Sequence, residues 1–130
     1  MDEKNSKDVS EVLCMSVAPD KERCEKSGIE ITGVGVTVLD GSSVVRINGD
    51  VTGNYDATMR MPFGWRWSIA AVVRDKEGGS LGWVESPRLE LLSGAPCAPF
   101  RVDLDLGEFD MDRADRIELY PFAVRAENQD

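Results

Sequence analysis

The three tryptophans of this sequence are the residues best suited to holding a ligand, because an indole ring exposed to water can stack on a sugar ring or a peptide. Trp67 lies on the apolar side of an alternating run and is expected in the core, where β-sandwich domains often bury a tryptophan. Trp65 opens that run near the rim, and is assigned either to the core or to a binding surface. Interpreting 63–65 as a rim loop predicts a ligand-binding set of Phe63, Trp65 and Trp83.

Four carboxylates gather in one short stretch near the C-terminus, at Glu108, Asp110, Asp112 and Asp115. Carboxylate oxygens are the usual calcium ligands, and calcium accepts irregular cages of oxygen atoms. The EF-hand pattern fails, because a loop that starts at Asp103 places Glu108 where glycine is required and Ala114 where glutamate is required. An irregular calcium site is therefore one hypothesis for this stretch, and a solvated acidic loop is the alternative.

Most familiar catalytic sites are excluded by composition. The sequence contains no histidine, which removes Ser-His and Cys-His nucleophile pairs and histidine-bound zinc. Its three cysteines, Cys14, Cys24 and Cys97, form no C-x-x-C pair, so a zinc ribbon or thioredoxin-like site is not indicated. Gly33 and Gly35 lie within a strand pattern rather than before a helix, so no dinucleotide fingerprint is present. We expect no enzyme activity and no cofactor.

The charge balance limits the partners. With 24 acidic and 15 basic residues the formal charge is −9, and no basic cluster interrupts the acidity, so nucleic acid is not an expected partner. No run of about 18 apolar residues occurs, and membrane insertion is not expected. The polar N-terminus lacks the apolar core of a signal peptide. Two localisations stay open: cytoplasmic, which the odd number of cysteines favours, or extracytoplasmic with a removed export signal.

Alternation of apolar and polar residues with a period of two is the dominant local pattern. It is clearest at 99–106 and 65–74, and turn-forming Gly, Pro, Asp and Ser separate the runs. Such alternation is typical of antiparallel sheets with one face on a core and the other in water. The predicted strands cover about 12–17, 29–39, 43–53, 65–74, 80–85, 88–92, 99–106 and 116–125.

Helical evidence is thin by comparison. Residues 19–28 are expected to form a charged loop or a single helical turn, and no run of 11 or more residues has helical spacing between credible caps. Asn48-Gly49 presents a separate choice. It can form a two-residue hairpin turn, or it can lie inside one long strand with a bulge that the glycine permits.

Short strands at a spacing of roughly 10 residues predict an all-β fold, an immunoglobulin-like antiparallel β-sandwich of seven or eight strands. Residues 1–10 are expected to be a disordered tail and residues 11–126 a single sandwich domain. The predicted core consists of alternating apolar residues from both sheets: Val34, Val36, Val38, Val45, Ile47, Val51, Trp67, Ile69, Val73, Phe100, Val102, Leu104, Ile117 and Leu119.

Four short motifs carry a resemblance to a known family: INGDVTGN at 47–54, VVRDKEG at 72–78, LLSG at 91–94 and PFRV at 99–102. Together, over about residues 44–124, they resemble the bacterial FxLYD-type sandwich domains. The aromatic-Asp element of that family is replaced here by Val73-Arg74-Asp75. The resemblance implies an immunoglobulin-like, typically extracytoplasmic accessory module without transferred catalytic residues. It also favours one long strand through Asn48-Gly49.

The resulting functional expectation is a non-catalytic interaction or structural module, for which the resemblance implies association with the cell surface. It would bind protein through a sheet edge or its rim loops, since a partner can add a strand to an exposed edge. The alternative is a carbohydrate-binding module that uses exposed tryptophans. The sequence indicates no oligomeric state.

Overall fold

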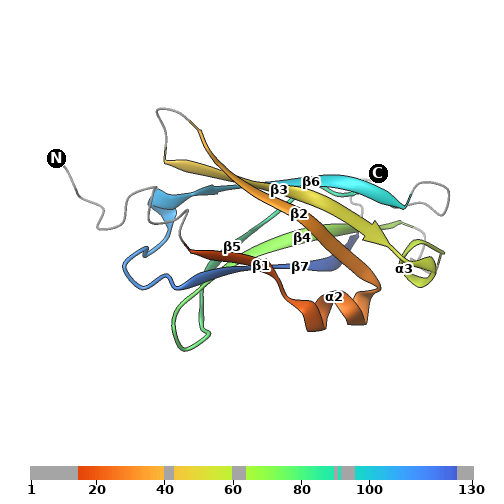
Figure 1. The fold of residues 1–130 in the computed structure, drawn as a ribbon, viewed down its shortest axis with the longest axis horizontal. Coiled ribbons are helices and arrows are strands. Elements are labelled where there is room, and N and C mark those ends of the chain that lie inside the picture. Colours follow the sequence, from red (N-terminus) through yellow and green to blue (C-terminus); the bar gives the residue numbers. More distant parts are fainter. Residues whose placement is uncertain (1–14, 40–42, 60–63, 90, 92–95, 126–130) are drawn as a thin grey trace.

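Two β-sheets packed face to face make up the protein in a computed structural model that describes residues 15–39, 43–59, 64–89, 91 and 96–125 (Figure 1). The predicted tail, residues 1–10, lies outside the described residues. The four-stranded sheet has the order β1 (Ser16–Pro19), β7 (Arg116–Arg125), β4 (Trp65–Arg74), β5 (Ser80–Glu85). The three-stranded sheet has the order β2 (Ile29–Val38), β3 (Val44–Gly53), β6 (Cys97–Asp105). Three short helices join them: α2 (Lys21–Ser27), α3 (Tyr55–Met59) and the 3-10 turn η1 (Leu106–Glu108).

The all-β prediction is confirmed, and the order of the strands adds detail to it. Every pairing is antiparallel except that of β1 with β7, which is parallel. Constant-type immunoglobulin domains place their last two strands side by side in one sheet. Here β6 and β7 lie in different sheets, and β7 pairs with β4.

Two predicted strands differ from the observed ones. The run predicted at 12–17 is observed from Ser16 to Pro19, and its first residues lie outside the described part. The run predicted at 88–92 contributes only an isolated bridge between Leu89 and Trp67 among its described residues. Pro87, which precedes this segment, lacks the N–H that a sheet ladder needs, and this disfavours further ladder bonds directly after β5.

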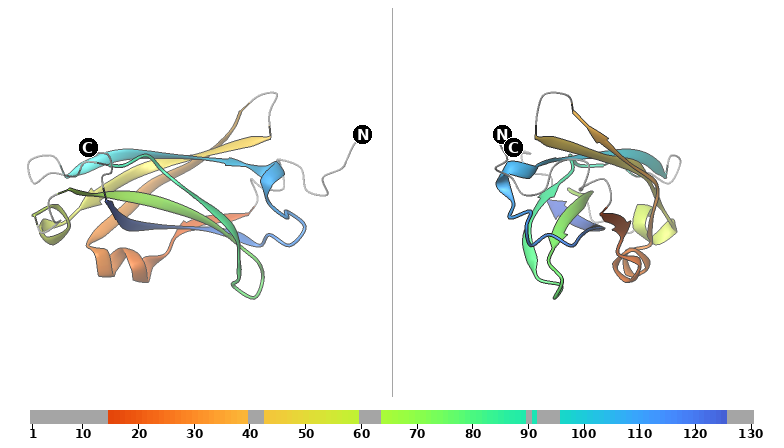
Figure 2. Two further views of the ribbon diagram at one scale, coloured as in Figure 1. Left: turned by 180° about the vertical axis from the view of Figure 1, so that it is seen from behind. Right: turned by 60° about the vertical axis from the view of Figure 1, so that its left-hand side comes forward.

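The core forms between the two sheets, as the alternation predicts (Figure 2). Ten of the predicted residues are buried, and Val34, Val36 and Trp67 pack against them while partly exposed. Val38, near the end of β2, is only half-buried and lies outside the cluster. Residues outside the prediction complete the core: Cys24, Ile29, Ile31, Ala57, Ala71, Leu89, Leu91, Leu106, Met111 and Ala114.

β3 is one continuous strand of 10 residues, so the long-strand prediction through Asn48-Gly49 is confirmed. The bulge lies in the neighbouring strand, where Gly33 and Val34 of β2 together face Gly49. Gly33 takes a φ of 64°, a conformation that glycine adopts without the steric penalty of other residues. The extra residue bends β2 and interrupts its outer edge at that point.

Pro121 shows why β1 is short. Ile69, which faces Pro121 across the β4–β7 pair, uses its backbone N–H and C=O on the other side, toward Ser86. The ring nitrogen of Pro121 therefore points to the β1 side of β7, where it can donate no hydrogen bond. β1 ends at Pro19, opposite Leu119, and the chain turns into α2 before it reaches the proline.

Gly49 is the position in β3 that tolerates no side chain. A Cβ there would lie 2.8 Å from Cε2 of Phe100 and 2.9 Å from the carbonyl oxygen of Thr32. We expect Gly49→Ala to lower the free energy of unfolding by about 1–3 kcal/mol, because the backbone contact cannot relax without moving β2. Urea unfolding checks this, with Gly107→Ala as the control, since its nearest neighbour would be at 3.4 Å. Equal midpoints for the two variants would contradict it.

Candidate functional site

The residues predicted to bind a ligand do not form one surface. Trp65 faces Arg125 in the register of β4 and β7, and its side chain lies on the core side of the sheet with Trp67 and Ile69. Trp83 faces Val72, whose side chain lies on the opposite side. Phe63 lies outside the described residues. Trp65 and Trp83 are therefore separated by the sheet itself.

Trp67 has the structural role expected of it. It packs against the core, and its Nε1 donates a hydrogen bond of 3.0 Å to the carbonyl oxygen of Ala57 in α3. This bond satisfies the one polar atom of the ring. Trp67 thus ties α3 to the four-stranded sheet, which is a structural role.

Trp83 belongs instead to an aromatic strip on the outer face of the four-stranded sheet, which we define as Trp83, Phe122 and Tyr120. The ring centroids of Trp83 and Phe122 lie 6.0 Å apart, edge to face, although β4 runs between their strands. Tyr120 follows at 6.4 Å from Phe122. The guanidinium carbon of Arg23 in α2 lies 4.1 Å from the Tyr120 ring centroid, in cation–π contact.

The aromatic strip corrects one expectation about β4. In the alternating run 65–74, Ser68 lies between the core residues Trp67 and Ile69 and is therefore expected on the face open to water. In the structure Ser68, Ala70 and Val72 on that face are all buried. Their small side chains allow the rings of β5 and β7 to meet above them. Trp83 keeps 53% of its surface exposed, so one large aromatic does remain in water on this face.

Glu118 lies beside the aromatic strip, between two arginines. Its Oε1 accepts a 2.8 Å hydrogen bond from Arg74 Nε, and its Oε2 accepts a 3.1 Å bond from Arg116 Nε. The bond from Arg74, followed by that from Arg116, lowers the pKa of the Glu118 carboxyl against the opposing effect of burial. The pair with Arg74 joins β4 to β7, whereas the pair with Arg116 lies within β7, and both stabilise the sheet.

The predicted calcium ligands are not gathered into a cage. Glu108, Asp110 and Asp112 are exposed, and an Asp115 carboxylate oxygen lies 3.3 Å from Arg116 Nη1. Within the part of the chain that the structure describes, no three Asp, Glu or Cys side chains are close enough together to hold a metal ion. The structure therefore gives the calcium hypothesis no support.

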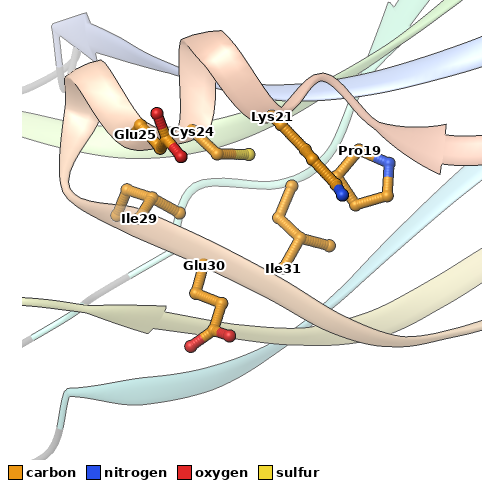
Figure 3. A pocket seen from close by; sticks show the side chains of 7 residues that line it. All are labelled: Pro19, Lys21, Cys24, Glu25, Ile29, Glu30 and Ile31. Carbon is orange, nitrogen blue, oxygen red and sulfur yellow. The ribbon is translucent and has the colours of Figure 1, made fainter.

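A hollow of about 390 Å³ lies between α2 and β2 (Figure 3). Its lining residues are Pro19, Lys21, Cys24, Glu25, Ile29, Glu30 and Ile31. Figure 3 shows the side chains of Cys24, Ile29 and Ile31 between the helix and the strand, with Lys21 beside them, Glu25 on the helix, and Glu30 pointing away from the helix on the other side of β2. The hollow is thus apolar inside and charged at its rim, which is the usual composition of a binding pocket.

The strand that lines this hollow is an edge of its sheet, because β3 is the one strand among the described residues to which β2 is bonded. The backbone N–H of Asn54 donates a hydrogen bond to the carbonyl oxygen of Gly28. Because bonded and non-bonded pairs alternate in an antiparallel ladder, Gly28, Glu30 and Thr32 direct their backbone groups to β3. Ile29 and Ile31 lie between these positions, so their backbone N–H and C=O groups point away from β3.

These outward groups are unusual because they are buried. Ile29 and Ile31 are only 4% and 7% exposed, and none of the described residues supplies a partner for their outward backbone groups. Buried backbone groups are seldom left unpaired. Either water in the hollow or a further strand must satisfy them.

A second hollow, of about 360 Å³, adjoins the first at the C-terminal end of α2. The two share Cys24, Glu25, Ile29 and Glu30. We call the pair the α2–β2 groove. The bulge at Gly33 interrupts the edge of β2 beyond the groove, so only a short stretch of strand is available there.

α2 exists because its ends are capped. The side chain of Asp20 accepts a hydrogen bond from the backbone N–H of Arg23, and Gly28 ends the helix with a φ of 74°. Asp20 and Gly28 were visible in the sequence as cap residues around seven helix-compatible ones, a signal that predicts two turns rather than one.

Cys24 is the single buried residue of α2, and burial, with a smaller effect from Asp20, raises the pKa of its thiol. A neutral thiol suits an apolar lining better than a nucleophile.

Removing the charge of Glu118 tests the ion pairs beside the aromatic strip. We expect Glu118→Gln to lose about 1 kcal/mol of stability at neutral pH. Because the native pKa is lowered, the contribution is complete above the ordinary glutamate value of 4.5 and is lost as the pH falls below it. Thermal unfolding from pH 7 to 2.5 should therefore show the two proteins converging in acid, whereas Glu85→Gln, on the same face, should match the parent throughout. A gap that persists at pH 2.5 would refute this account.

No described helix has the length and apolar character required to cross a bilayer. Comparisons with protein-family models, with curated proteins and with solved structures find no match to this chain.

Proposed function

We propose that the protein is a non-catalytic interaction module that binds an extended polypeptide segment as an additional strand on the edge of β2. The observation that carries this proposal is the pair of buried, outward-facing and unpartnered backbone positions at Ile29 and Ile31, beside the α2–β2 groove. An added strand supplies the missing partners, and its side chains have the groove to occupy.

The other sheet edges are less suited to a guest strand. The carbonyl oxygen of Pro96 accepts a hydrogen bond from the backbone N–H of Gly53, so Pro96 and every second residue after it bond to β3. Pro99 lies between these positions, and its ring nitrogen faces outward, where it has no N–H to donate. Exposed Arg101 and Asp103 follow on the same edge, and charged residues disfavour strand addition. β1 has four residues, and the pairing of β5 with β4 is irregular near Arg74.

Energetics indicate how such a guest is held. Two outward residues offer up to four backbone hydrogen bonds, each contributing about 0.5–1.5 kcal/mol. Association costs on the order of 4–15 kcal/mol, so the backbone bonds do not suffice. An aliphatic side chain buried in the groove contributes roughly 1.5–3 kcal/mol more. We therefore infer that the guest carries an aliphatic anchor and binds weakly.

The protein is proposed to be immunoglobulin-like only in its architecture of two packed sheets. Sandwich domains that share two packed sheets do not all share one strand order. The separation of β6 and β7 into different sheets argues for such a relative rather than for the immunoglobulin topology itself.

Selection from a random heptapeptide phage library against the immobilised protein tests strand addition. We expect selected peptides to slow hydrogen exchange at the amides of Ile29 and Ile31 and to leave Arg101 and Asp103 on β6 unchanged. Cys24→Phe, which fills the groove, should abolish binding, while Cys97→Phe on an exposed position should not. Peptides that leave Ile29 and Ile31 unaffected, or a selection that yields no binder, would overturn the proposal.

The exposure of Trp83 favours a second candidate function, carbohydrate binding on the aromatic strip. An indole ring 53% exposed can stack on a sugar ring, while Tyr120 at the other end of the strip and Glu118 beside it can bond the hydroxyls. If this function holds, a glycan array should give signals that Trp83→Ala removes. Trp65→Ala, on the core side of the same sheet, should keep them. Signals indifferent to Trp83, or an array without signals, would exclude it.

A further inference from the structure

The α2–β2 groove is electrically polarised along its length. Lys21 lines only the first hollow, next to Pro19 and Ile31. Glu25 and Glu30 line both hollows, and the second contains no basic residue at all. The charge on the lining therefore changes from mixed at the Pro19 end to acidic at the Gly28 end.

The three charges are available to a guest. Lys21 and Glu25 are four residues apart on α2, a spacing at which such residues often pair. The described part of the chain nevertheless contains no ion pair of either residue, and none of Glu30. By contrast, Glu22 lies on the same helix but outside the groove, and its Oε2 is 3.7 Å from Nζ of Lys26.

The second hollow also offers neutral oxygen atoms. Thr52 and Asn54 line it together with the two glutamates. Asn54 Oδ1 already accepts from the N–H of Ala57 and so holds a fixed place at one end of the hollow. A cationic side chain has several donors and no acceptor, and it is the group that such a lining of oxygens complements.

We propose that the guest strand carries a lysine or arginine, whose side chain lies in the second hollow, which Glu25 and Glu30 both line, next to the aliphatic anchor in the first. This inference rests on the proposed strand addition and specifies which segments the groove selects. The formal charge of −9 acts in the same direction, because it attracts a basic segment from a distance.

The test compares three targets in the same heptapeptide selection. Peptides selected on the parent protein should be enriched in Lys or Arg beside an aliphatic residue. The enrichment should vanish on the double variant Glu25→Gln, Glu30→Gln, and it should persist on Glu22→Gln, which breaks only an exposed pair. The control removes one negative charge from the same helix without touching the groove.

Affinity measurements then isolate the basic side chain. The strongest peptide is synthesised with its Lys or Arg replaced by norleucine, which keeps the stem and removes the charge. We expect binding to the parent to weaken about tenfold at low salt, the effect of one charge-assisted hydrogen bond. On the double variant the two peptides should bind alike.

The outcomes separate the two proposals. Peptides that protect Ile29 and Ile31 but show no basic preference, or keep it on the double variant, would overturn this inference and leave strand addition standing. A selection without any peptide at the β2 edge would overturn both.

Discussion

The backbone bonding of β3 on both of its sides is the constraint on which the rest of the structure depends. Its 10 residues pair with β2 along one side and with β6 along the other. Val45, Ile47 and Val51 are fully buried on its inner face and form the centre of the core. Because β3 is continuous, Gly49 must pass the Phe100 ring closely, and the bulge that accommodates the mismatch falls in β2. The open edge of β2 and its interruption are both consequences of that arrangement.

Local pattern predicted the strands well because period-two alternation reports a half-buried surface directly. Runs such as 99–106 and 116–125 were placed to within two residues of the observed strands. The pattern failed where burial comes from another strand. Ser68, which alternates with the core residues of β4, looks like a residue of a solvent face, and only the pairing with β7 shows that it lies opposite Phe122.

The candidate site was beyond prediction for the same reason. Whether a strand lies at an edge depends on which distant segment pairs with it, and the sequence does not encode this locally. Ile29 and Ile31 read as ordinary strand residues. Their outward backbone becomes significant only because α2, held by Asp20 and Gly28, packs beside an edge that no strand of the described part covers. The tryptophans, by contrast, are candidate ligand-binding residues on residue type alone. In the structure, however, Trp67 is structural and Trp65 lies apart from Trp83.

The bulge at Gly33 has a consequence for self-association. An uninterrupted, flat edge can template one copy after another and grow into a fibril, a risk that natural sheets limit with kinks and charges. Here the stretch available beside α2 ends at the bulge, after only two outward-facing positions. Such an edge has room for a short segment of the kind proposed above and is too short to template a long one. The same irregularity that interrupts the ladder is thus a safeguard against runaway polymerisation, and it leaves intact the two positions on which the proposed strand addition depends.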